Sequence, residues 1–166
     1  VGSGSLDAED TGSRNVAIGF SALSALNYNG SGYNVAVGYN AGEVVTTGIK
    51  NTLIGAFAGD AITTGVANVA IGYGALDSAT TGAPNTAVGS YALALNTTAD
   101  FNTAVGYSVL YANTTGVRNT AVGTYALVAN TTGHKNVAVG MQSLDANTTG
   151  QYNTSVGYNS LSANTT

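Results

Sequence analysis

Carboxylates recur along this chain at a seventeen-residue spacing, and they are the side chains best suited to chemistry. Glu43, Asp60 and Asp77 follow one another at that spacing, and Asp7 and Asp145 keep the same register. If each period forms one coil of a stacked fold, neighbouring carboxylates lie about 5 Å apart. That separation suits the carboxylate pair of a retaining glycosidase, and it lets two carboxylates share a cation.

The same pattern nevertheless favours a solvated acidic stripe over a catalytic or metal site. Paired catalytic carboxylates need different environments, whereas these residues occupy equivalent positions. No calcium-loop motif accompanies them, His134 is the sole histidine, and cysteine is absent. One histidine cannot build a zinc site. We therefore expect no enzyme, no catalytic residue, no cofactor and no metal.

The repeat that positions these residues is clearest from Asn102 to Arg118, which reads NTAVGYSVLYANTTGVR. Its first Asn recurs at 15, 34, 51, 68, 85, 102, 119, 136 and 153, in steps of seventeen residues after a first step of nineteen. We number the slots of the unit from this Asn. Slot two is Val or Thr, slot three is mostly Ala, slot four is Val or Ile, slot five is Gly, and slot nine is usually Leu. In two neighbouring copies the defining structural residues are Asn102, Val105, Gly106, Leu110, Asn119, Val122, Gly123 and Leu127.

A fixed period this short indicates a solenoid in which one unit forms one coil. We predict an all-β, parallel β-solenoid (β-roll) of about ten 17-residue coils, with residues 1–166 as a single repeat domain. Slots one to six alternate as a strand does, and we expect a second short strand over slots seven to twelve. The two extra residues fall near 27–33 and predict an insertion loop at the coil's edge. Both ends of the sequence lie inside a unit, so we expect a segment of a longer fibrous protein.

Two rows of the predicted strand are held nearly constant, which implies that both are in contact. We expect the Val/Ile row to fill the coil's interior, and the Ala/Gly row to let another backbone approach closely. That backbone could belong to the opposite wall of a thin coil or to a neighbouring subunit. Which of the two rows lies inside stays open at this point. In the copies starting at Asn34 and Asn51, Gly replaces the slot-nine Leu, so we expect repacking around Val44, Val45 and Ile62.

Aromatic residues follow a longer period of thirty-four residues. They lie at slot six in Tyr39, Tyr73 and Tyr107, and at slot seven in Phe57, Tyr91 and Tyr125. Identical rings stacked every 4.8 Å leave no room for offset geometry, and alternation provides it. A coil of thirty-four residues with two similar halves is the open alternative.

The composition limits the partners. Only 7% of residues are charged, the formal net charge is −4, and there are four Lys and Arg, at Arg14, Lys50, Arg118 and Lys135. These basic residues share slot seventeen, where we expect them to offset the acidic stripe. So few cations argue against nucleic acid, and no apolar run is long enough for membrane insertion. A surface this poor in charge suits a chain partly covered by other chains, so we expect self-association as a homotrimer.

The motif N-[VT]-A-[VI]-G-Y, as in 34–39 and 68–73, resembles the head repeats of trimeric autotransporter adhesins. Its seventeen-residue form, with a Leu and an Asn-Thr-Thr-Gly turn, resembles repeats of phage tail fibres. The resemblance implies a β-roll, a homotrimer, and an extracellular place on a virion tail fibre or a bacterial cell surface. It implies a structural shaft or head segment that acts as a rigid spacer and could contact a host-cell surface receptor or glycan. The alternative is an ice- or glycan-binding β-solenoid that uses the Thr-Thr pairs at slots thirteen and fourteen or the Tyr rows.

Overall fold

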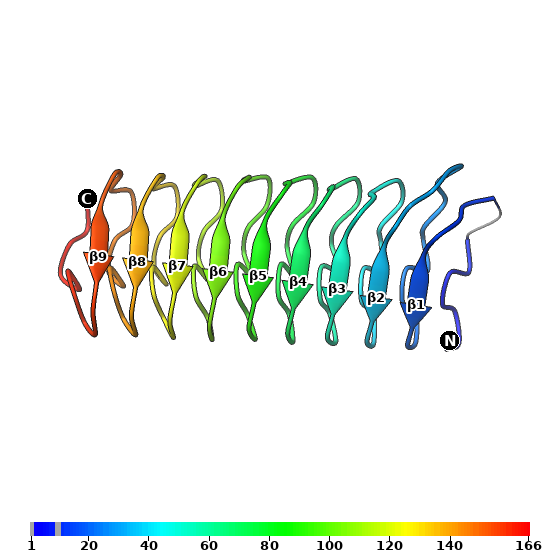
Figure 1. Cartoon of the computed structure of the whole chain (residues 1–166), viewed down its shortest axis with the longest axis horizontal. Helices are drawn as coiled ribbons and strands as arrows, with labels where there is room; N and C mark the ends of the chain where they lie inside the picture. The colour runs from blue at the N-terminus through cyan, green and yellow to red at the C-terminus, as the bar shows by residue number, and fades with distance from the viewer. Residues whose placement is uncertain (1, 9–10) are drawn as a thin grey trace.

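A computed structural model describes residues 2–8 and 11–166, and these form an all-β solenoid without a helix. Nine three-residue strands lie side by side in one parallel sheet, in the order of the sequence (Figure 1). They are β1 (Val16–Ile18), β2 (Val35–Val37), β3 (Thr52–Ile54), β4 (Val69–Ile71), β5 (Thr86–Val88), β6 (Thr103–Val105), β7 (Thr120–Val122), β8 (Val137–Val139) and β9 (Thr154–Val156). The parallel β-solenoid is therefore confirmed.

Each turn of the solenoid is one sequence repeat. Val88 pairs with Val105, and Val105 pairs with Val122, so residues seventeen apart are direct neighbours in the sheet. This register confirms the coil of roughly seventeen residues and excludes the thirty-four-residue coil. The solenoid has about eight such turns, fewer than the ten expected, because the segment before β1 contains no strand in its described residues.

The predicted second strand is wrong, since slots seven to twelve form a winding turn. Backbone hydrogen bonds still join successive coils there, as from the Leu110 N–H to the Ala126 carbonyl at 3.0 Å. The backbone cannot extend because slots seven and nine take left-handed φ, +48° at Ser108 and +50° at Leu110. A left-handed Leu is strained by about 1–2 kcal/mol, and burial of its side chain offsets that strain.

The interior is lined by the small row of the strand, so the expected placement of the Val/Ile row inside the coil is wrong. Ala104 at slot three and Leu110 at slot nine are fully buried, whereas Val105 at slot four is 36% exposed. The slot-nine Leu enters the coil from the turn and occupies most of a thin core. The strand facing it then has room only for Ala, and its larger side chains point outward.

The two coils without a slot-nine Leu show how this core is filled. A Cβ on Gly59 would lie 2.8 Å from a methyl of Leu53 and 2.8 Å from a methyl of Ile62. Leu53 replaces the usual Ala of slot three, and both Leu53 and Ile62 are fully buried, as is Val45. Repacking around Val45 and Ile62 is therefore confirmed, but Val44 is 39% exposed and takes no part in it.

The slot-five glycines make the close backbone approach that the sequence suggests. Gly106 has a φ of +138°, and a Cβ there would lie 2.8 Å from the carbonyl carbon of Gly123. The approaching backbone is therefore the next coil of the same chain. It is neither the opposite wall of the coil nor a neighbouring subunit.

Two asparagine ladders run through the interior beside the turn. At slot one, the Asn119 N–H donates to Asn102 Oδ1 at 2.9 Å, and Asn102 Nδ2 donates to the Gly116 carbonyl at 2.8 Å. At slot twelve, Asn113 Nδ2 donates to Asn96 Oδ1 at 2.9 Å. The slot-one Asn that marks the start of each repeat thus forms the first ladder, and the Asn of slot twelve forms the second.

The insertion lies at the edge of the first coil, as expected. Ser13 and Ser31 form an isolated parallel bridge, and the Gly32 N–H donates to the Ser13 carbonyl at 3.0 Å. The ring of Tyr28 packs partly buried against the core. The extra residues therefore widen one edge turn and leave the register of β1 and β2 intact.

Candidate functional site

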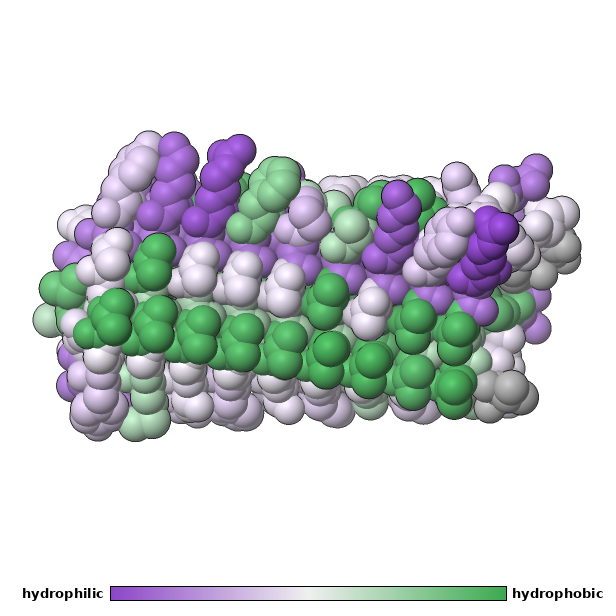
Figure 2. Space-filling view, in the orientation of Figure 1, coloured by the Kyte–Doolittle hydropathy of each residue, from purple (hydrophilic) through white to green (hydrophobic). Residues whose placement is uncertain are grey.

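A continuous apolar ridge runs along the sheet and is the largest regular feature of the surface. It consists of the slot-four residues, and Figure 2 shows it as an unbroken green band along the rod. Its members are Ile18, Val37, Ile54, Ile71, Val88, Val105, Val122, Val139 and Val156. Several of them in the inner coils, such as Val105 and Val122, are 36–37% exposed. The predicted structural residues thus divide into two groups: Asn102, Gly106 and Leu110 hold the coils together, and Val105 faces outward.

The acidic residues of slot ten have different surroundings: those from Glu43 to Asp145 are partly buried, whereas Asp7 is exposed. Burial, a hydrogen bond with Asp77, and the charges of Asp77 and Glu43 raise the pKa of Asp60 from 3.8 to about 7. Asp145, from the same slot, lies alone and has one buried oxygen without a hydrogen-bond partner. Among the described residues, no group of three or more His, Asp or Glu side chains is arranged to hold a metal ion.

Three of the four basic residues of slot seventeen, Arg14, Arg118 and Lys135, lie against aromatic rings of their own row. The Arg14 guanidinium is 5.4 Å from the centre of the Tyr33 ring, and Lys135 Nζ is 4.7 Å from that of Tyr152. Tyr152 also contacts His134 edge to face, with ring centres 6.4 Å apart. Cation–π contact therefore occupies these cations. From the sequence we expect these cations only to offset the acidic stripe, and the aromatic contacts are an additional finding.

The Thr-Thr pairs do not form the free hydroxyl array that ice binding at that position would require. The Thr114 hydroxyl at slot thirteen donates to the Thr131 carbonyl at 3.2 Å, and the Thr131 hydroxyl donates to the Thr148 carbonyl at 3.1 Å. The slot-fourteen residues, such as Thr115, are exposed. One hydroxyl of each pair thus belongs to the stacking of the coils.

The aromatic residues form an alternating row beside the ridge. Ring centres of Tyr107 and Tyr125 are 5.5 Å apart at 87°, and those of Tyr73 and Tyr91 are 5.3 Å apart at 75°. Edge-to-face geometry is favourable for aromatic pairs, so the expected purpose of the alternation is confirmed. The surrounding rings remove water from the Tyr91 phenol and, with the neighbouring Tyr73, raise its pKa. That phenol therefore stays neutral at physiological pH.

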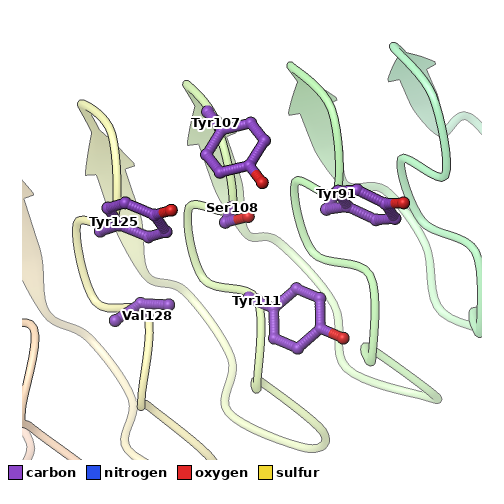
Figure 3. A pocket seen from close by; sticks show the side chains of 6 residues that line it. All are labelled: Tyr91, Tyr107, Ser108, Tyr111, Tyr125 and Val128. Carbon is purple, nitrogen blue, oxygen red and sulfur yellow. The ribbon is translucent and has the colours of Figure 1, made fainter.

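One stretch of the aromatic row is hollowed into a recess of about 430 Å³. Figure 3 shows Tyr107 and Tyr111 on opposite sides of Ser108, with Tyr91 and Tyr125 in the coils on either side. The remaining lining residue is Val128. A smaller recess of about 260 Å³ shares Tyr91 and is lined also by Phe57, Tyr73, Gly74 and Asp77. Neither recess was predicted from the sequence, although Tyr111, the one aromatic residue at slot ten, was a signal.

Comparison of the chain with protein-family models, with curated proteins and with solved structures finds no match. Among the described residues, no helix has the length and apolar character needed to cross a membrane.

Proposed function

We propose that this chain is a structural segment, a rigid spacer in the shaft or head of a trimeric extracellular fibre. The fibre would be a phage tail fibre or a bacterial surface adhesin. The observation that carries this proposal is the unbroken apolar ridge of slot-four residues along the sheet. A surface that repeats in every coil suits a contact made along the whole rod, whereas an enzyme needs a catalytic site in one coil that differs from the others.

Three features support a rod that keeps its shape under load. All eight strand pairings hold the same register, and the two asparagine ladders connect coils through buried side chains. The slot-five glycines bring successive backbones into contact. Bending such a rod would break many equivalent contacts at once, so stiffness follows from the repetition.

Self-association through the ridge would complete the molecule. Long apolar patches on soluble proteins mark contact surfaces, and three chains closed around an axis would remove all three ridges from water. The partner is thus a second and a third copy of this chain. Contact with a host-cell surface receptor or glycan would use the surfaces that remain outside.

The test is the solution mass of the 16.4-kDa chain, measured by sedimentation and light scattering at micromolar concentration. We expect three times the chain mass. Val105→Asp places a carboxylate in the ridge and should give monomers, since burying an unpaired charge is strongly unfavourable. Thr115→Asp adds the same charge on an exposed turn and should leave the trimer intact. A folded wild-type monomer would refute the assembly.

The sheet also favours a second candidate, ice binding. Thr86, Thr103 and Thr120 at slot two form a hydroxyl row beside the ridge, about 7 Å away across the strand and repeating every 4.8 Å along the rod. A flat array with two fixed spacings can order water. This candidate requires the sheet to be free, so it predicts a monomer that inhibits ice recrystallisation and a Thr103→Lys variant that does not.

A further inference from the structure

The recess around Ser108 arises because small and large residues alternate at slot seven. Tyr91 and Tyr125 hold this slot in the flanking coils, and Ser108 holds it between them. The missing ring leaves a hollow with a floor at Ser108, which is 7% exposed. Tyr107 and Tyr111 close it from slots six and ten (Figure 3). Its volume of about 430 Å³ lies within the usual range of small-molecule sites.

The chemistry of the lining selects a neutral ligand that has both apolar faces and hydroxyl groups. Four phenol rings offer apolar faces, and each ends in a hydroxyl that can donate and accept. None of the six lining residues is charged, so an ion entering the recess would lose hydration without gaining a counter-charge. A sugar ring matches this lining, because its C–H face packs on an aromatic ring and its hydroxyls reach the phenols.

We propose that this recess binds one residue of a neutral glycan, and that the glycan runs along the rod. The smaller recess has a similar arrangement two coils away, with Gly74 in the place of Ser108 and with Tyr91 shared between the two. It differs at slot ten, where Asp77 takes the place of Tyr111 and offers a carboxylate that can accept hydrogen bonds from sugar hydroxyls. Two coils correspond to about 9.6 Å. That spacing is on the scale of a disaccharide, so one extended oligosaccharide can occupy both hollows.

The neighbouring coils explain why the row is not hollowed in the same way throughout. Asn40 stands at slot seven two coils before Gly74, and its amide donates a short hydrogen bond to Glu43. Gln142 stands there two coils after Ser108. Both side chains are longer than serine, and neither residue lines one of the two recesses. Binding therefore belongs to the Gly74 and Ser108 coils.

The test uses the full chain with cellohexaose, maltohexaose and β-1,4-mannohexaose as probes. Binding is followed by calorimetry and by tyrosine fluorescence, which is readable because the chain has no tryptophan. We expect at least one hexasaccharide to bind at or below millimolar concentration, and the corresponding trisaccharide to bind more weakly because it spans fewer subsites.

Two variants locate the binding. Ser108→Gln fills the recess with the residue found at Gln142, and Tyr111→Val removes one ring by using the residue that stands at slot ten in the next coil. Each should weaken hexasaccharide binding by about tenfold. The control, Tyr39→Ser, removes an exposed ring that lines neither recess and should leave the affinity unchanged.

Three results would overturn the proposal. The first is that no probe binds at about 5 mM, a concentration that would reveal even weak binding. The second is that Ser108→Gln leaves binding unaffected. The third is that the chain prefers tetramethylammonium, the ligand expected of a cation–π cage. The solution mass is measured separately. Failure of the trimer and failure of glycan binding can therefore be told apart.

Discussion

Replacing Gly106 by alanine should weaken the stacking of the coils, because the added methyl group would meet the backbone of the next coil. Gly106 has a φ of +138°, a region that side chains strongly disfavour. A Cβ there would lie 2.8 Å from the Gly123 carbonyl carbon, 2.9 Å from its oxygen and 3.2 Å from the Thr124 nitrogen. All three obstacles are backbone atoms of the next coil, so no side-chain rotation can relieve them.

The magnitude follows from two contributions. The unfavourable φ costs about 1–3 kcal/mol, and overpacking against a fixed neighbour costs about 1–3 kcal/mol. Their sum of about 2–6 kcal/mol would lower the melting temperature of a chain of this size by about 4–24 °C. Even the lower limit is readily measured by circular dichroism.

The matched control is Gly74→Ala, in a central coil as well. Gly74 has a φ of +59°, which non-glycine residues adopt at the same slot in other coils, such as Ser108. Its added Cβ would lie 3.1 Å from the Tyr91 ring, an exposed side chain that can move. We expect about 1–2 kcal/mol from the left-handed φ, or a decrease of about 2–8 °C. Equal melting temperatures for the two variants would refute the backbone contact as the reason for glycine at slot five.

Three further changes test the acidic row, the slot-one ladder and the exceptional core. The raised pKa of Asp60 means that the folded chain binds an extra proton between about pH 4 and 7, so stability falls as the pH rises through that range. Asp60→Asn should therefore stabilise the chain by about 1–2 kcal/mol at pH 8, after solvent screening, and leave it unchanged at pH 3, as read from urea unfolding. Asn119→Ala should cost about 2–5 kcal/mol, because the buried Asn136 N–H loses its acceptor, and hydrogen exchange at Asn136 should accelerate. Leu53→Ala should cost about 2–5 kcal/mol in thermal unfolding, and adding Gly59→Leu should recover part of it, whereas an additive loss would contradict the shared core space.

The repeat period was predictable because stacking demands identity at the same slot. A parallel coil places each residue directly over its copy, so an Asn ladder or a row of glycines must recur at every step. The seventeen-residue recurrence of residues such as Gly106 and Asn102 is therefore enough to predict a solenoid with one repeat in each coil. The alternation of Tyr107 and Tyr125 was readable for a related reason, since rings of neighbouring coils cannot occupy the same position.

Which face of the strand lies inside was not predictable from that periodicity. The usual rule places Val105 in the core and Ala104 outside, and here the reverse holds. The deciding residue is Leu110, which enters the core from a left-handed position in the turn. A Leu with positive φ is unusual in general, so sequence patterns alone gave no reason to expect it.

The recess was equally hidden, since it depends on a missing ring as much as on those present. Tyr91, Tyr107 and Tyr125 obey the alternation, and the larger hollow forms where Ser108 at slot seven is combined with Tyr111 at slot ten. Neither residue breaks the repeat at a constrained slot. Only the three-dimensional arrangement shows that the ring missing at Ser108 and the ring present at Tyr111 border the same space.

The constant slots of this chain maintain the fold, whereas the variable slots set its surface chemistry. Slots one, three, five and nine contact the coils above and below or fill the core, so a change there propagates through the stack. Slot ten, by contrast, holds Glu43, Tyr111 and Val128 without altering the strand register. A rod built in this way can change its surface chemistry coil by coil while its shape stays fixed. Ligand preference should therefore reside in slots six, seven and ten, and substitutions in those slots should alter binding without altering assembly.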